Sequence, residues 1–257
     1  MTQDLTGQVA IVTGGSDGIG LATAALLVRR GAKVVICGRR QEQLDIASAH
    51  IEAEGGTVEA VQLDVTDFPA FEALIQDVAA RHGRLDMLVN NAMSVHYAPI
   101  SKLTLDHWRK DFAVNSEAVF VGTKAAMAVM GKQGKGSIVN ISSTTGIRAM
   151  ANYASYSASK AALIQFTAVA AMEGALKGIR VNAIVPGQVN TAATADFALK
   201  APELAAKTAG AIPMGRGGKP EELAEAIVFM LSDAASYITG VALPVDGGKS
   251  AQLYIPS

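Results

Sequence analysis

Residues 9–20 read Val-Ala-Ile-Val-Thr-Gly-Gly-Ser-Asp-Gly-Ile-Gly, a short apolar run that leads directly into a glycine-rich turn. The apolar run predicts a buried strand, and the pattern that follows Gly18 predicts a helix. Glycines in such a turn let a pyrophosphate approach the backbone, where the N–H groups and dipole of the helix N-terminus bind it. The spacing G-x-x-x-G-x-G differs from the commoner G-x-G-x-x-G, so a purely structural tight turn is the alternative interpretation.

Short β-branched runs alternate with Ala-rich, helix-periodic segments along the whole chain, which favours repeated βαβ units. The predicted strands are Val9–Thr13, Lys33–Cys37, Val58–Leu63, Leu85–Asn90, Ser137–Ile141, Arg180–Val185 and Val241–Val245. The predicted helices begin near Gly18, Gln41, Phe68, Leu105, Tyr153 and Glu221. The strands are continuously apolar, as expected when both faces of a sheet are covered. We therefore predict an α/β fold with a doubly wound, Rossmann-type parallel sheet of about seven strands and helices on both faces.

Residues 1–257 are predicted to form a single domain, since α/β folds of this size are commonly one domain. The segment Thr191–Gly218 interrupts the alternation of strands and helices, because it combines weak helix signals with Pro202, Pro213 and four Gly. We expect a mobile insertion after the sixth strand, in which a substrate lid near residues 191–218 could lie.

The composition excludes several classes of protein. The 22 basic and 23 acidic residues leave a net charge of −1, so neither nucleic acid nor an anionic membrane is an expected partner. Residues Met1–Gln8 lack the features of a secretory signal, and the apolar stretch Ala161–Met172 is too short to span a membrane. A single cysteine, Cys37, fits a cytoplasmic location. The four His and one Cys show no metal-ligand spacing, so no metal is expected.

The end of the second strand bears on cofactor choice. An acidic residue about 20 positions beyond the last glycine of the turn would bind an NAD ribose. Here the sequence reads Gly38-Arg39-Arg40, without a carboxylate, so Arg39 could bind the 2′-phosphate of NADP, although two solvated arginines are the alternative. Asp17 would repel that phosphate. Because Asp17 can point to solvent, we give Arg39 more weight and predict that NADP(H) is preferred and NAD(H) possible.

Tyr156 and Lys160 lie four residues apart at the start of an Ala-rich helix, and so on one helix face. A nearby ammonium favours the phenolate and lowers the tyrosine pKa, which suits proton exchange between a carbonyl and an alcohol. A Y-x-x-x-K pattern also occurs by chance, so a surface Tyr–Lys pair is the alternative.

Taken together, the motifs resemble the short-chain dehydrogenase/reductase family, in particular its members of roughly 250 residues with TGxxxGxG and YxxxK motifs. The similarity extends from about Gly7 to Lys249. The matching stretches are Thr13-Gly14-x-x-x-Gly18-x-Gly20, Leu63-Asp64-Val65, Asn90-Asn91-Ala92, Asn115, Ser142-Ser143, Tyr156-x-x-x-Lys160, Pro186-Gly187 with Thr191, and Asp246-Gly247-Gly248.

The resemblance implies four catalytic residues. Ser143 would hydrogen-bond the substrate oxygen, with Ser142 as the alternative, and Tyr156 would be the general acid in reduction and the general base in oxidation. Lys160 would bind the nicotinamide ribose and depress the tyrosine pKa. Asn115 would hold a water that connects Lys160 to solvent.

The resemblance also implies the cofactor contacts. Asp64 would accept from the adenine amino group, Asn91 would shape the middle of the cleft, and Thr191 would bind the nicotinamide carboxamide. The full predicted set is Gly14, Ser16, Asp17, Gly18, Ile19, Gly20, Arg39, Arg40, Asp64, Val65, Asn91, Ala92, Tyr156, Lys160, Pro186, Gly187, Val189 and Thr191.

Substrate contacts are expected from Met93, His96, Tyr153 and Gln188. Family members usually have Gly where this chain has Met93, so this side chain would either crowd the nicotinamide ribose, form a wall of the pocket or simply fill a gap. A merely solvated loop histidine is the alternative for His96. The Ala-rich lid favours a small or medium substrate.

We therefore predict an NADP(H)-preferring oxidoreductase that interconverts a carbonyl and a secondary alcohol. The alternatives are an NAD(H)-preferring alcohol dehydrogenase of the same family, a non-redox lyase and a dinucleotide sensor. The intact Tyr156, Lys160 and glycine set oppose the last two. The predicted helices Asp106–Met130 and Ala154–Ala175 are apolar over more than one stripe, which together with the resemblance indicates a homotetramer.

Overall fold

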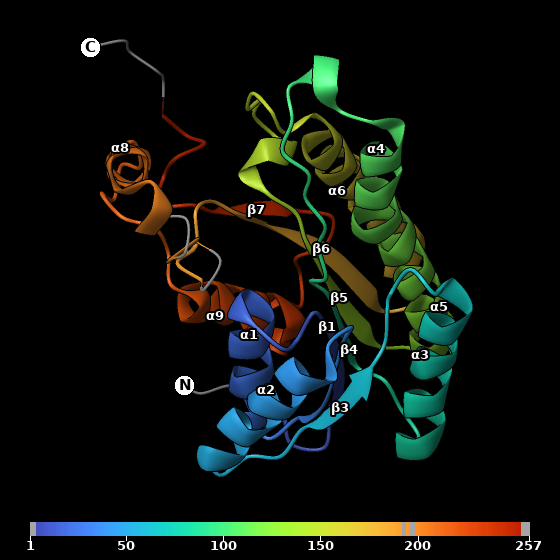
Figure 1. Ribbon diagram of the computed structural model, residues 1–257. Coiled ribbons are helices and arrows are strands. Elements are labelled where there is room, and N and C mark those ends of the chain that lie inside the picture. The colour runs from blue at the N-terminus through green and yellow to red at the C-terminus, as the bar shows by residue number, and fades with distance from the viewer. Residues whose placement is uncertain (1–3, 192–193, 196–198, 253–257) are drawn as a thin grey trace.

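The computed structural model describes residues 4–191, 194–195 and 199–252. Within these residues, seven parallel strands form one sheet in the order β3-β2-β1-β4-β5-β6-β7 (Figure 1). The strands are β1 Val9–Thr13, β2 Lys33–Gly38, β3 Glu59–Gln62, β4 Met87–Asn90, β5 Gly136–Ile141, β6 Ile179–Pro186 and β7 Ala242–Val245. The predicted doubly wound parallel sheet is confirmed, and no strand end differs from the predicted one by more than two residues.

Helices cover both faces of the sheet (Figure 1). One face packs on α1 Gly18–Arg29, α2 Gln41–Ala53 and α9 Pro220–Leu231, and the other on α3 Phe68–His82, α5 Ala118–Gln133 and α6 Ala154–Ala175. Within β1, Ala10 and Val12 belong to the first core, while Val9 and Ile11 belong to the second. Successive side chains of a strand point to opposite faces, so a strand covered on both faces is apolar at every position.

The predicted helix Asp106–Met130 is interrupted in the structure. It consists of α4 Leu105–Phe112, a π-helical turn Ala113–Glu117 and α5. The turn is wider than an α-turn, because the Ala118 N–H bonds to the carbonyl of Ala113. Such single turns often lie at functional sites, and this one contains Asn115.

The strand order places the predicted site motifs at one edge of the sheet. β1 lies between β2 and β4. From β1 the strands proceed through β2 to β3 at one edge of the sheet, and from β4 they proceed through β5 and β6 to β7 at the other, so the strand order reverses between β1 and β4. In doubly wound folds, ligands bind in the crevice outside the carboxyl ends of the strands at this point. The glycine turn, Asn91, Ser143 and Gly187 all follow the C-terminal end of a strand, which brings distant parts of the chain to one crevice.

The two ends of the predicted lid lie side by side. Val189 and Gly218 form an isolated parallel bridge, and the Gly218 N–H donates to the carbonyl of Gln188 at 2.9 Å. Between them the structure describes a helix, α8 Pro202–Gly210, and residues 192–193 and 196–198 of the predicted lid lie outside the described residues. The substrate-lid role stays a prediction.

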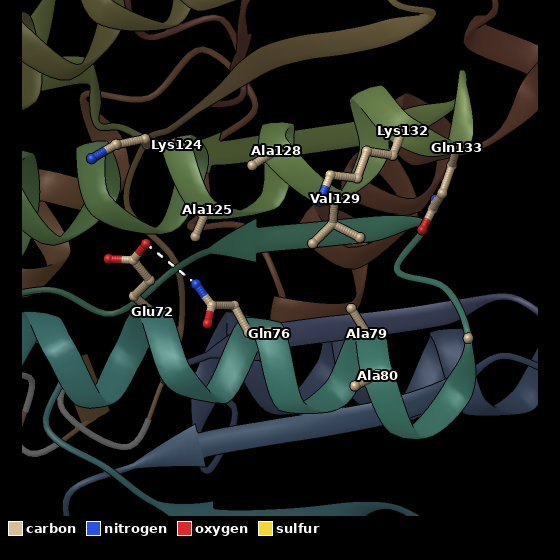
Figure 2. A pocket seen from close by; sticks show the side chains of 11 residues that line it. Glu72, Gln76, Ala79, Ala80, Lys124, Ala125, Ala128, Val129, Lys132 and Gln133 are labelled. Carbon is tan, nitrogen blue, oxygen red and sulfur yellow. Dashed lines mark hydrogen bonds between the residues drawn. The ribbon is translucent and has the colours of Figure 1, made fainter.

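A surface groove lies outside the predicted site. A groove of about 440 Å³ runs between α3 and α5, lined by Ala79, Ala125 and Ala128 with Glu72 and Lys124 at its rim (Figure 2). It contains none of the predicted site residues. No helix in the described part of the chain combines the length and the apolar character that crossing a membrane requires.

Candidate active site

The glycine turn after β1 packs tightly on the end of β4. A Cβ on Gly14, where φ is +62°, would lie 3.0 Å from the Ala92 Cα, and a Cβ on Gly20 would lie 2.1 Å from the Gly14 carbonyl oxygen. Asn91 Nδ2 donates to the carbonyls of Thr13 and Gly14, both at 3.0 Å. The turn therefore requires glycine at these positions, and Asn91 holds it in place.

Arg39 and Asp17 take different positions at the mouth of this turn. Arg39 is exposed, and within the described residues its side chain makes no hydrogen bond or ion pair. Asp17 caps α1, because its Oδ1 accepts from the Gly18 N–H at 2.7 Å. Asp17 is exposed to solvent, as expected, but its carboxylate is not free, because it is turned to the helix N-terminus, where N–H groups lack partners within the helix.

Some of the other predicted cofactor residues contact this turn, and others follow strand ends. A Cβ on Gly38 would lie 3.4 Å from Ser16 Oγ, and one on Gly18 would lie 3.0 Å from the Thr191 side chain. Asp64 Oδ1 accepts from the backbone and hydroxyl of Thr66, at 2.9 and 2.8 Å. The places of the remaining members in the fold are as follows: Ile19 in α1, Arg40 at the start of α2, Val65 buried after β3, Ala92 after β4, Pro186 and Gly187 at the end of β6, and Val189 buried at the base of the lid.

These residues fit a dinucleotide. The turn offers the free N–H groups of a helix N-terminus, has no room for a Cβ at Gly14 or Gly20, and has the exposed guanidinium of Arg39 beside it. Within the described chain, no three His, Cys, Asp or Glu side chains gather closely enough to hold a metal ion.

Tyr156 and Lys160 lie together in the first turns of α6. Lys160 is buried, its Nζ donates to the carbonyl of Ile141 at 2.7 Å, and that nitrogen lies 5.7 Å from the centroid of the Tyr156 ring. Burial lowers the pKa of Lys160 to about 7. Burial also raises the pKa of Tyr156 to about 12, although a hydrogen bond with Ser143 acts in the opposite direction. The predicted depression of the tyrosine pKa is not seen, because desolvation of the phenolate outweighs the favourable contacts.

The two candidate serines have different partners. Ser142 is buried, and its hydroxyl donates to the main-chain carbonyl of Lys160 at 3.0 Å. Ser143 Oγ accepts from the Thr145 N–H and hydroxyl, at 3.2 and 3.1 Å, and hydrogen-bonds Tyr156. The geometry therefore supports Ser143 as the serine beside the reacting oxygen and gives Ser142 a structural role.

Both polar groups of the Asn115 side chain form hydrogen bonds within the protein. Its Oδ1 accepts from the Ser94 N–H at 2.9 Å, and its Nδ2 donates to the Ser94 carbonyl at 2.8 Å and to Ser159 Oγ at 3.0 Å. That Asn115 holds a water stays a prediction. The side chain itself fixes the loop after β4 against α6.

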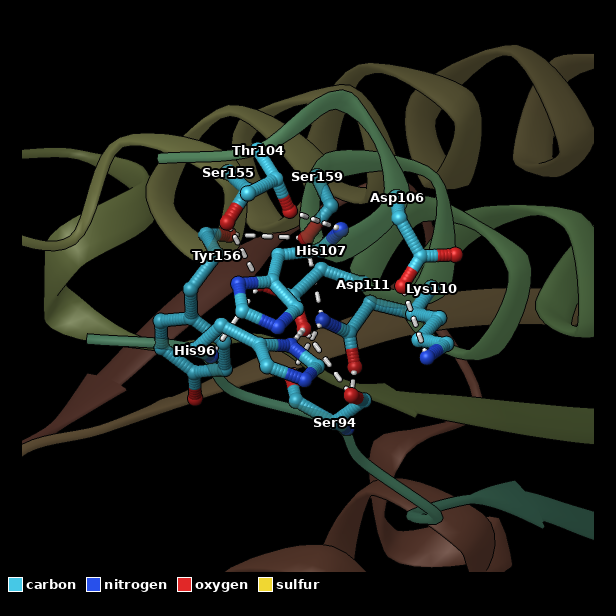
Figure 3. Close-up of polar contacts among 11 residues, drawn as sticks. Ser94, His96, Thr104, Asp106, His107, Lys110, Asp111, Ser155, Tyr156 and Ser159 are labelled. Atoms are coloured by element: carbon cyan, nitrogen blue, oxygen red, sulfur yellow. Dashed lines mark hydrogen bonds and ion pairs between the residues drawn. The ribbon is translucent and has the colours of Figure 1, made fainter. Parts of the chain in front are cut away.

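A polar cluster beside these residues was not predicted from the sequence. Asp111 is fully buried on α4 and is surrounded by Ser94, His96 and Ser155 (Figure 3). In the sequence, Asp111 follows Lys110 and has the appearance of an ordinary surface charge. The available signal was its spacing: it lies four residues before Asn115, and therefore on the same helix face.

Tyr153, one of the predicted substrate residues, belongs to an aromatic row that ends at Tyr156. The ring of Tyr153 packs edge-on against Tyr97 at 4.8 Å and against Tyr156 at 6.2 Å, measured between centroids. Met93 and Tyr97 are 52% and 63% exposed, so both side chains are accessible to solvent. The remaining two have specific surroundings: His96 is bound to Asp111, and Gln188 has a buried Oε1 without a partner among the described residues.

Comparison with known proteins agrees with this arrangement. The family model described as enoyl-(acyl carrier protein) reductase matches residues 14–250. 2,5-Dichloro-2,5-cyclohexadiene-1,4-diol dehydrogenase LinX of Sphingobium indicum is 41% identical over 250 residues, which cover 97% of this chain and 99% of that protein. The chain belongs to the short-chain dehydrogenase/reductase family. As in other members of this family, the activity is that of an oxidoreductase acting on alcohol and carbonyl groups.

Two further family members are similar over most of their length. Cis-4-hydroxycyclohexanecarboxylate dehydrogenase of Sinomonas cyclohexanicum is 42% identical, covering 95% of this chain and 97% of that protein. A crystal structure of an NAD(P)-dependent protein from Beutenbergia cavernae, with NADP bound at low occupancy, superposes with a TM-score of 0.92. That protein is 38% identical, and the match covers 98% of this chain and 100% of the other.

Proposed function

We propose that the protein interconverts a carbonyl and a secondary alcohol with NADP(H) as its preferred cofactor and with Tyr156 as general acid and base. The observation that carries this proposal is the juxtaposition of Ser143, Tyr156 and Lys160 at the switch-point crevice, next to a glycine turn that leaves no room for side chains. The exposed Arg39 at the end of β2 supports the choice of NADP(H) over NAD(H).

Each side chain has a defined task in reduction. A nicotinamide bound in the crevice would supply the hydride that the carbonyl carbon accepts. Ser143 donates a hydrogen bond to the carbonyl oxygen, and Tyr156 transfers its phenolic proton to that oxygen as negative charge develops on it. Lys160, with a pKa of about 7, can hold or release a proton at neutral pH beside the phenolate that remains. In oxidation the same groups act in reverse.

We further propose that the substrate is a cyclic alcohol or ketone. Two of the relatives described above act, by their names, on six-membered carbocyclic alcohols. The aromatic row of Tyr97, Tyr153 and Tyr156 provides flat apolar surfaces next to the reacting hydroxyl. Such surfaces suit a ring better than a flexible chain, since a ring loses less conformational freedom on binding.

A matched pair of ketones tests the proposal. We expect NADPH-dependent reduction of cyclohexanone with a kcat/KM at least about tenfold above that of 2-hexanone, equivalent to ~1.4 kcal/mol of differential binding. A 3-oxoacyl thioester, assayed in parallel, covers the acyl-carrier type of substrate. Preference for 2-hexanone or the thioester would contradict the substrate class alone. Absence of turnover with any carbonyl or alcohol, with either cofactor, would contradict the proposed function.

We also propose a homotetramer in the cytoplasm. The outer faces of α5 and α6 expose Phe120, Val169 and Met172 by 51%, 47% and 64%, although both helices already cover the sheet with another face. Apolar side chains gathered on such a face favour burial against another subunit. The buried thiol of Cys37 fits a reducing compartment. Light scattering at micromolar concentration should give four times the monomer mass, and a stable monomer would contradict the assembly.

A further inference from the structure

Asp111 is a buried charge that the reaction as described does not use. Its side chain is fully buried on α4, and an isolated carboxylate in such surroundings is strongly destabilised. Burial by itself would raise its pKa, but hydrogen bonds from Ser155, His96 and Ser94 together lower it. The carboxylate is therefore ionised at neutral pH and acts as an acceptor for every neighbour around it.

The donors to Asp111 come from two other parts of the chain (Figure 3). Ser155 Oγ donates from the first turn of α6 at 2.5 Å. From the loop after β4, Ser94 Oγ donates at 2.9 Å, the His96 N–H at 3.2 Å, and His96 Nδ1 lies 2.7 Å from Oδ1. One carboxylate thus joins α4, α6 and the loop after β4 at a single point.

The hydrogen bonds of Asp111 with Ser155 and with Ser94 connect it to residues of the proposed reaction. Ser155 directly precedes Tyr156, so its hydrogen bond to Asp111 restrains the turn of helix that carries the reactive phenol. The main-chain N–H of Ser94 donates to the Asn115 side chain, and the Ser94 carbonyl accepts from it. The imidazole of His107 stacks on that of His96 at 4.4 Å, one helical turn before Asp111, and covers the cluster.

We propose that Asp111 is a positioning residue, which holds the phenol of Tyr156 and the amide of Asn115 in their working places. This inference rests on the proposed role of Tyr156 as general acid and base. Asp111 also exerts a charge effect: its negative charge disfavours the phenolate of Tyr156, as do Tyr97 and Tyr153, while the hydrogen bond with Ser143 favours it. Lys160 and the imidazole of His96 are the other titratable groups nearby.

The substitution Asp111→Asn keeps the shape of the side chain and removes its charge. We expect kcat to fall about tenfold, since a small displacement of a reacting group is enough to slow the reaction. KM for NADPH should change by less than about twofold, because Asp111 lies outside the predicted cofactor contacts. In alcohol oxidation, which needs the phenolate, the rise of activity with pH should move to lower pH, because loss of the negative charge lowers the tyrosine pKa.

Two further variants make the test decisive. Asp106→Asn is the matched control, because Asp106 lies on the same helix but is 68% exposed and pairs with Lys110 in solvent; this variant should behave as wild type. Ser155→Ala keeps the buried charge of Asp111 but removes the hydrogen bond that Ser155 donates to it. This variant should have a lower kcat, and its pH profile should not move to lower pH. If Asp111→Asn does not fold, an unchanged kcat in Ser155→Ala overturns the proposal.

The outcomes separate this inference from the proposed function. Tyr156→Phe is assayed beside Asp111→Asn, and if Tyr156→Phe stays active, the proposed function itself fails. If Tyr156→Phe is inactive while Asp111→Asn keeps the wild-type kcat and pH profile, only the role of Asp111 is overturned. A lower kcat in Asp111→Asn with an unmoved pH profile would assign Asp111 a merely structural role and would also overturn it.

Discussion

Replacing Tyr156 with Phe should lower the rate of ketone reduction by about 10²- to 10⁴-fold, the usual contribution of a general acid or base. The substitution removes the phenolic proton and keeps the ring, so the packing against Tyr153 at 6.2 Å should persist. NADPH should therefore still bind. The measurements are initial rates of carbonyl reduction and the change of NADPH fluorescence on mixing with the variant.

The control for this substitution is Tyr237→Phe. Tyr237 is fully exposed at the opposite, N-terminal edge of the sheet, so its loss should leave both activity and NADPH binding unchanged. A Tyr156→Phe variant that keeps more than about a tenth of wild-type activity would remove Tyr156 from the central role. A variant that fails to bind NADPH would instead indicate damage to the cofactor crevice.

Replacing Arg39 with Ala should lower kcat/KM for NADPH about 10- to 150-fold, because each charge-assisted hydrogen bond to the 2′-phosphate contributes about 1.5–3 kcal/mol. The value for NADH should hardly change. The structure supports this selectivity, since the Arg39 side chain has no partner among the described residues whose loss would disturb the fold. Steady-state kinetics with both cofactors measure the effect. A wild type that is faster with NADH, or an Arg39→Ala variant that loses equally with both cofactors, would contradict the assignment.

Asp17 offers the complementary test. Asp17→Arg should raise kcat/KM for NADPH, because it replaces a charge that repels the 2′-phosphate with one that attracts it. Its carboxylate also caps α1, so this variant should lose some stability, in the range of about 0.5–2 kcal/mol for a lost cap. Asp17→Asn separates the two effects, since asparagine keeps a capping oxygen without the charge. An unchanged NADPH preference in both variants would exclude Asp17 from cofactor selection.

Much of the fold was predictable from local pattern. β1 begins and ends at the predicted residues, and α1, α2, α3 and α4 begin at the predicted ones. This agreement arises because a strand buried on both faces must be apolar throughout, and because helices start where a turn residue precedes an apolar period. The break at Ala113–Glu117 was not predicted, since a π-helical turn leaves the apolar periodicity of the flanking helices nearly unchanged.

Several of the predicted site motifs follow strand ends, and those ends meet at one edge of a parallel sheet, so their proximity could be expected from the sequence. The roles of these residues stay predictions. The resemblance favoured Ser143 over Ser142, but the sequence could not show that the Ser142 hydroxyl is turned to the Lys160 carbonyl, nor that burial raises the pKa of Tyr156. Both depend on the direction of a side chain and on the loss of water around it, which are properties of the assembled molecule.

By itself, then, the sequence determined the parallel sheet, the glycine turn after its first strand and the pairing of Tyr156 with Lys160, since each follows from periodicity or from spacing along one element. Only the tertiary structure decided which charges are buried. Asp106 and Asp111 lie on the same helix within five residues of one another, yet the first is 68% exposed and the second is fully enclosed by α6 and the loop after β4. The difference is the environment that distant segments create, and through the cost of burying a charge it decides which carboxylate must be matched by hydrogen-bond donors.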